Sequence, residues 1–138
     1  RLVLFNYIFS NGDAHLKNFS LFRTEMGDYN LTPAYDLMST VLHTPNEPDT
    51  ALDLYTGDTD SKFYSSYGYF GQADFRIFAG KIGLVPVRTE RILTQLLSSK
   101  TRVLDMIGQS FLNEETKIKY KNAYLDKVGR LGMTLRPK

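Results

Sequence analysis

An aspartate and an asparagine five positions apart, Asp13 and Asn18, are the residues of this sequence best suited to chemistry. Both lie in segment 11–20, which follows an apolar stretch and precedes a short stretch typical of a β-strand. A positioned carboxylate can accept the proton of an attacking hydroxyl, and an amide oxygen is a neutral ligand that suits the hard ion Mg²⁺. The spacing of the pair is that of the catalytic loop of kinases, which transfer a phosphoryl group from a magnesium-bound nucleotide.

A second carboxylate, Asp36, follows in segment 31–40, after a predicted hairpin. Magnesium is usually held by one or two carboxylates together with the phosphates of its substrate. A lone aspartate after a hairpin is usually a turn or cap residue, and the spacing of Asp13 and Asn18 is common by chance. The ordered combination is that of a protein kinase. It predicts a catalytic loop at 11–20 and a metal-binding loop at 31–40.

These two segments, with His15 and Lys17 in the first and a Pro-x-Tyr-Asp sequence in the second, resemble the C-terminal domain of HipA-type serine/threonine kinases. Members of that family are the toxins of bacterial toxin–antitoxin pairs. The resemblance extends more loosely through 52–54 and 74–84, and only compatible helices follow Pro86.

The resemblance implies ATP- and Mg²⁺-dependent phosphorylation of a serine or threonine in a protein substrate. Asp13 would be the catalytic base, and Asn18 and Asp36 would hold the metal ion and, through it, the nucleotide. A HipB-like DNA-binding antitoxin would be a partner of the whole toxin.

Three further side chains of the catalytic loop have alternative roles. His15 would orient the loop or contact the phosphates, or it would pack the loop against the core. Lys17 would stabilise charge on the γ-phosphoryl group in the transition state, or it would be a solvated loop residue. Ser20 is expected to be structural, because no base is spaced to activate its hydroxyl.

The pattern along the chain predicts a mainly α structure with a small β-hairpin (α+β), the helical C-lobe of a kinase-like fold, as one domain over 1–138. Helical periodicity and end signals predict helices at 1–10, 72–82 and 86–111, and a last helix capped by Asn113. The expected hairpin pairs strands 19–22 and 29–31, alternation allows a strand at 51–55, and the Gly- and Ser-rich stretch 57–71 is expected to be an irregular surface loop.

Composition narrows the classes of protein that remain. The 138 residues contain no cysteine, so disulfides and thiolate zinc sites are excluded, and their two histidines leave little scope for a histidine-rich metal site. No apolar run approaches the roughly 20 residues that cross a bilayer, so we expect no membrane partner and a cytoplasmic location. Residues 1–60 hold three basic and nine acidic residues, whereas 100–138 hold nine and four. The acidic part suits a cation site; the basic part would face nucleic acid or an acidic partner, or would be a solvated helix face.

Two elements of a full kinase have no candidate in the sequence, namely a glycine-rich loop over the phosphates and a lysine that grips the nucleotide. The chain also begins with Arg1 directly before an apolar run. We therefore expect a fragment, inactive alone, whose N-lobe is in the same or a separate chain. Two alternatives stay open. One is a magnesium-dependent phosphohydrolase using Asp13, Asp36 and His15; the other is a non-enzymatic module that binds an antitoxin or nucleic acid.

Overall fold

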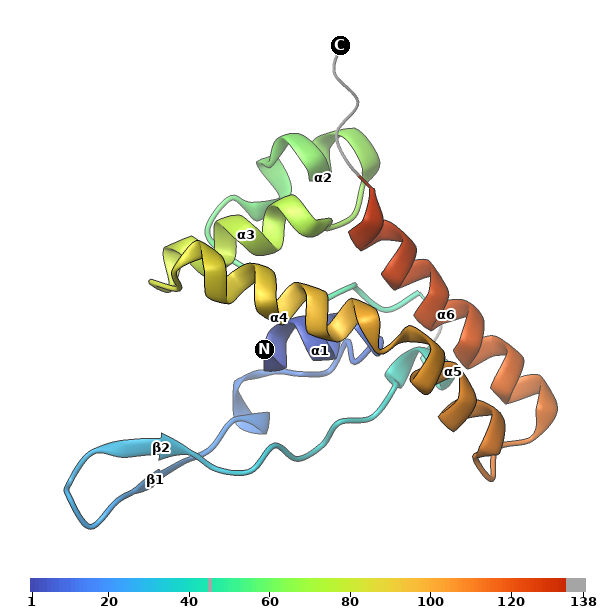
Figure 1. The fold of residues 1–138 in the computed structure, drawn as a ribbon, viewed down its shortest axis with the longest axis horizontal. Helices are drawn as coiled ribbons and strands as arrows, with labels where there is room; N and C mark the ends of the chain where they lie inside the picture. The colour runs from blue at the N-terminus through green and yellow to red at the C-terminus, as the bar shows by residue number, and fades with distance from the viewer. Residues whose placement is uncertain (45, 134–138) are drawn as a thin grey trace.

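The computed structural model describes residues 1–44 and 46–133, and it is helical with one hairpin, as the sequence predicts (Figure 1). Pro45 and the end of the basic C-terminal stretch lie outside the described residues. The helices of the described part are α1 Leu2–Ile8, α2 Lys62–Tyr67, α3 Gln72–Lys81, α4 Pro86–Ser98, α5 Lys100–Gln109 and α6 Glu114–Gly132. Short 3₁₀ turns occupy Leu16–Asn18, Thr40–Leu42 and Asp58–Asp60. No helix of these residues is long and apolar enough to cross a membrane.

Helix α1 lies at the centre of the core because nearly all its side chains are apolar. Tyr7 and Ile8 are each 1% exposed and join a cluster with buried residues of α3, α4 and α6: Phe75, Leu93, Tyr124 and Leu131. The Tyr7 hydroxyl donates a hydrogen bond of 2.6 Å to the carbonyl of Phe70. Figure 1 shows α4 crossing α1, with α6 on the side away from the hairpin. The core thus fixes the end of α1 from which the predicted catalytic loop departs.

The hairpin extends away from this helical body (Figure 1). Strands β1, Leu21–Arg23, and β2, Tyr29–Leu31, pair antiparallel with Leu21 opposite Leu31, and all their residues are exposed. The first strand begins two residues later than the predicted 19–22, because Asn18 still belongs to a 3₁₀ turn. Gly27, with φ of 89°, supplies the left-handed conformation of the connecting turn.

Two predictions for the middle of the chain are wrong. Residues 51–55 form no strand; the amide of Leu54 donates to the side chain of Asp58 at 2.7 Å instead of to a neighbouring strand. Stretch 57–71 is not irregular throughout, because it contains α2. The hydroxyl of Ser61 accepts a hydrogen bond from the Tyr64 amide at 3.0 Å and so caps that helix.

The single long helix predicted at 86–111 is also wrong, since it is divided into α4 and α5 at Ser99. The hydroxyls of Ser98 and Ser99 both donate to the carbonyl of Gln95, at 3.1 and 2.9 Å. Serine side chains that bond to a preceding carbonyl compete with the helical ladder. The last helix begins as predicted, because Asn113 accepts a hydrogen bond of 2.8 Å from the amide of Thr116.

Candidate functional site

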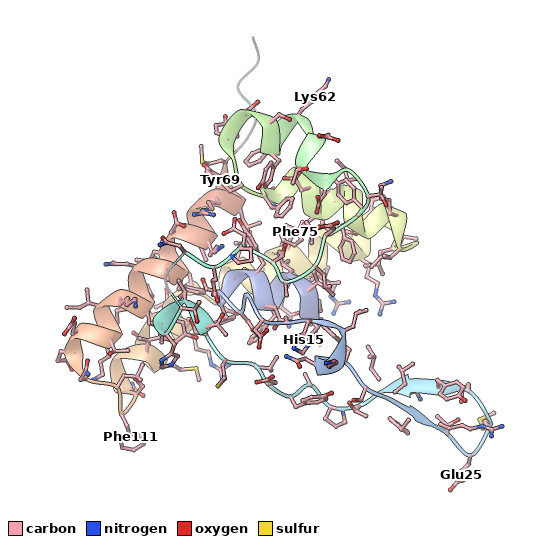
Figure 2. All side chains as sticks on the ribbon, turned by 180° about the vertical axis from the view of Figure 1, so that it is seen from behind. His15, Glu25, Lys62, Tyr69, Phe75 and Phe111 are labelled. Atoms are coloured by element: carbon pink, nitrogen blue, oxygen red, sulfur yellow. The ribbon has the colours of Figure 1, made fainter. Side chains whose placement is uncertain are left out.

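The predicted catalytic loop is a compact turn that leaves the buried end of α1. Ser10 has a φ of 52°, which directs the chain out of the helix. The amide of His15 donates to the carbonyl of Asp13 at 2.7 Å, and the amide of Asn18 donates to the carbonyl of His15 at 2.9 Å. The Asn18 side chain then reaches back to the Asp13 carbonyl at 3.1 Å. Asp13 and Asn18 are therefore held at one turn, as their spacing predicts. The loop with His15 lies between the helical body and the hairpin in Figure 2.

The structure brings Asn18 and Asp36 into direct contact across the hairpin. Nδ2 of Asn18 donates to Oδ2 of Asp36 at 2.9 Å. Asp36 has a φ of 53°, an uncommon conformation for a residue with a side chain. Nδ2 of Asn11 holds that backbone by donating to the Asp36 carbonyl at 3.0 Å. The two residues that the sequence predicts as metal ligands are thus adjacent although 18 positions separate them.

The oxygen atoms of Asn18 and Asp36 form a donor set that fits Mg²⁺, an ion that takes hard oxygen ligands and keeps several waters. The described residues contain no group of three or more His, Cys, Asp or Glu side chains that could hold a metal ion. The remaining ligands would therefore be phosphate oxygens and water. The amide of Asn18 would turn to present its oxygen, because in this structure it presents its nitrogen to Asp36.

The side chain of Asp13 is 67% exposed, as a base that meets a protein hydroxyl must be. Nε2 of His15 lies 3.8 Å from Oδ1 of Asp13, and Nδ1 of His15 is buried without a hydrogen-bond partner among the described residues. Lys17 is exposed, and within the described part of the chain its ammonium group makes no ion pair. His15 is thus beside the expected base, and Lys17 extends into solvent.

A second connection, which sequence analysis missed, joins the two loops through Thr40. The Thr40 hydroxyl accepts a hydrogen bond from the amide of Gly12 at 2.8 Å and lies 2.6 Å from Oε1 of Glu47. The Thr40 amide donates to the carbonyl of Ser10 at 3.0 Å. A Cβ atom on Gly12 would come within 2.9 Å of the backbone carbonyl oxygen of Pro48, so this close approach requires glycine. We call Gly12, Thr40 and Glu47 the threonine clasp.

Tyr35 forms a third connection at the base of the hairpin. Its hydroxyl donates to the carbonyl of Lys17 at 2.8 Å and lies 2.7 Å from the hydroxyl of Ser20. Ser20 therefore has a structural partner, in line with its expected role. The position of Tyr35 next to Asp36 was the sequence signal that could have identified Tyr35 as a site residue. The sequence offered no such signal for Thr40 or Glu47.

Helix α6 anchors the segment that carries Glu47. Lys127 of α6, whose side chain is 9% exposed, forms an ion pair with Asp49. Arg130 pairs with Asp49 at 2.8 Å and with Asp126 at 2.7 Å. Burial lowers the pKa of Lys127 and outweighs the opposing effect of Asp49. Because Asp49 is two residues from Glu47, this ion-pair group fixes the outer end of the threonine clasp.

Comparison with known proteins identifies a matching family and two relatives. Residues 1–104 match the model of a family described as HipA-like C-terminal domain. A "Putative kinase" of Haemophilus influenzae is 28% identical over 120 residues, which are 81% of this chain and 35% of that protein. A "Putative kinase Y4dM" of Sinorhizobium fredii is 42% identical over 54 residues, 39% of this chain and 13% of that protein. The chain thus spans about a third, or less, of the length of these curated relatives.

Proposed function

Since the chain belongs to the family of HipA-like C-terminal domains, we propose that it is the catalytic lobe of an ATP- and Mg²⁺-dependent serine/threonine protein kinase. Kinase names among its relatives support a kinase-related protein. The observation that carries the more specific proposal is the contact of 2.9 Å between Asn18 and Asp36. The same Asn18 side chain donates to the backbone carbonyl of Asp13, whose carboxylate is exposed.

In the proposed reaction, the oxygen of a substrate serine or threonine forms a bond to the γ-phosphorus of ATP, and the bond from that phosphorus to the bridging oxygen of ADP breaks. Asp13 accepts the proton of the attacking hydroxyl. Asn18 and Asp36 would hold Mg²⁺, which when bound neutralises charge on the phosphates. Lys17 would contact the transferred phosphoryl group. His15, 3.8 Å from Asp13, would orient that carboxylate.

The rest of the machinery belongs to this proposal as well. An N-lobe, in the same or a separate chain, would supply the phosphate-covering loop and the nucleotide-gripping lysine. The substrate would be a protein, a HipB-like antitoxin would be a partner of the whole toxin, and the reaction would take place in the cytoplasm. The present chain alone would transfer phosphate slowly or not at all.

The experiment measures transfer from γ-labelled ATP with Mg²⁺, scoring labelled protein and free phosphate separately. It compares a full-length protein that contains this domain, its Asp13→Asn and Asp36→Asn forms, and the present chain. Asp105→Asn is the matched control, because Asp105 is an exposed aspartate on α5. We expect labelled protein from the full-length protein and the control, and at least a hundredfold loss in the two site variants.

Three other outcomes would overturn the proposal. Free phosphate released through Asp13 without labelled protein would indicate the phosphohydrolase. Full labelling by the Asp13→Asn form would remove the assigned base. No labelling or free phosphate from any form, with antitoxin or nucleic acid still bound, would favour the non-enzymatic module.

A further inference from the structure

A cavity of about 270 Å³ lies directly behind the catalytic loop, on the side of α1 and of segment 49–54. Its wall is mostly apolar and includes Asn6, Ala14, Leu16, Phe19, Leu52 and Phe78. Leu16 and Leu52 are 73% and 42% exposed, so the wall of the cavity reaches the surface at these two residues. None of the proposed metal ligands lines it.

We propose that this cavity receives one apolar side chain of the protein substrate, from a residue close in sequence to the phosphorylated serine or threonine. The inference rests on the proposed kinase function and specifies the substrate segment that the same site would take. An extended peptide is commonly recognised in this way, with pockets for individual side chains that give specificity.

The wall of the cavity favours an apolar side chain over a nucleotide. Its volume of about 270 Å³ is at the small end of pockets for small-molecule ligands, which usually enclose about 300–1,000 Å³. The mostly apolar wall offers few partners for a sugar or phosphates.

The location connects the cavity to the reacting group. Asn11 and Ala14, which flank Asp13 on either side, are both part of the wall. The carboxylate of Asp13 is itself exposed. A peptide with one side chain in the cavity would therefore pass beside Asp13 and could present a nearby hydroxyl to it.

Asn6 provides a polar group suited to a peptide backbone. This residue is 6% exposed, belongs to the wall, and has a side-chain oxygen without a hydrogen-bond partner among the described residues. A buried acceptor without a partner is energetically costly. A backbone N–H of a bound peptide, reached by a small rotation of the Asn6 amide, is a donor that would satisfy it.

The acidic residues in the wall indicate which charge the peptide carries. Asp49 is already paired with Lys127 and Arg130. Asp53 also lines the cavity, is exposed, and forms no ion pair within the described part of the chain. The preferred segment would therefore have a basic residue close to the apolar one.

The test titrates the isotopically labelled chain with synthetic peptides and follows methyl signals by NMR, without ATP or Mg²⁺. Each peptide has one serine and one arginine on a glycine–alanine background, and one leucine is moved from three residues before the serine to three after it. Ala51→Leu partly fills the cavity, because Ala51 belongs to its wall. Ala73→Leu on α3 is the control, since Ala73 is not in that wall.

We expect one leucine position to shift the methyl signals of Ala14, Ala51 and Leu52. Ala51→Leu should weaken binding at least tenfold, Ala73→Leu should leave it unchanged, and Asp53→Asn should remove the preference for arginine. Thermal unfolding of each variant shows whether it is folded. If Ala51→Leu does not fold, the methyl shifts of the unaltered chain still test the inference.

Equal binding of peptides with and without leucine, or shifts only at methyls outside the cavity, would overturn the inference. So would displacement of the peptide by adenosine from the same methyls, because the cavity would then hold the nucleotide. Binding as described together with no phosphorylation by the full-length protein would refute the kinase instead. Phosphorylation that is indifferent to leucine would refute the cavity assignment and leave the kinase intact.

Discussion

Replacing Thr40 by valine tests whether the threonine clasp holds the catalytic loop against the metal-binding loop. Valine has nearly the shape of threonine but can neither accept the hydrogen bond of the Gly12 amide nor donate to Glu47. In the structure these two contacts measure 2.8 and 2.6 Å. The change therefore removes the polar contacts of one hydroxyl and leaves the packing almost unaltered.

The expected loss follows from the two groups left without partners. A neutral hydrogen bond contributes about 0.5–1.5 kcal/mol and one to a charged group about 1.5–3 kcal/mol. Both contacts are only partly buried, so water recovers some of this free energy, and we expect Thr40→Val to lower the free energy of unfolding by about 2–3 kcal/mol. The fall in Tm per kcal/mol is smaller for larger domains, and a chain of this size lies between small domains and domains of about 150–250 residues. The expected loss therefore corresponds to a fall in Tm of roughly 6–15 °C.

Urea denaturation and thermal unfolding measure this loss, and hydrogen exchange measures the release of the Gly12 amide. Thr40→Ser is the matched control, because it keeps the hydroxyl and should lose less than about 1 kcal/mol. A loss in Thr40→Val no greater than that in Thr40→Ser would refute the reasoning. So would unchanged protection of the Gly12 amide, since its acceptor would then be another group.

Three further predictions concern contacts outside the clasp. Asp49→Asn should lower the free energy of unfolding by about 3–5 kcal/mol, since it leaves the buried Lys127 without its counter-ion. Lys127→Met should lower the free energy of unfolding less, because Arg130 still pairs with Asp49. Urea denaturation measures both losses, and a larger loss in Lys127→Met than in Asp49→Asn would contradict this prediction. Burial lowers the pKa of Lys127, so the folded state holds this proton less tightly than the unfolded chain, and the free energy of unfolding should rise with pH between that lowered pKa and 10.5, a slope that Lys127→Met removes. Tyr35→Phe should cost only about 0.5–1.5 kcal/mol because the hydroxyl is exposed, yet hydrogen exchange of the Asn18 amide should become faster; equal exchange would show that Tyr35 does not hold the loop.

The local signals of the sequence were sufficient to predict which candidate site residues lie together. Asp13 and Asn18 meet in one turn because their spacing is short, and Asp36 joins them because a hairpin returns the chain. The N-terminal signal at Asn113 likewise predicted the start of α6, since a cap depends on residues within one turn.

The errors arise where distant or competing contacts determine the structure. The helix predicted at 86–111 divides because Ser98 and Ser99 bond to Gln95, and helical periodicity of apolar residues does not register such bonds. Segment 51–55 alternates like a strand, but no neighbouring strand pairs with it, and Asp58 takes the amide of Leu54. Thr40 and Glu47 could not be found from sequence, because their role depends on a fold that places them over Gly12.

The hairpin also has a consequence for how the isolated chain behaves in solution. Both outer edges of β1 and β2 have open backbone groups within the described residues, and Leu21, Phe22, Tyr29 and Leu31 are between 48% and 64% exposed. Open edges with apolar side chains are templates for strand addition between molecules. Only three residues form each strand, and Pro33 follows β2, which limits how far such a ladder can grow. The separate domain should therefore self-associate at high concentration through its hairpins, as small reversible oligomers and not as extended fibrils.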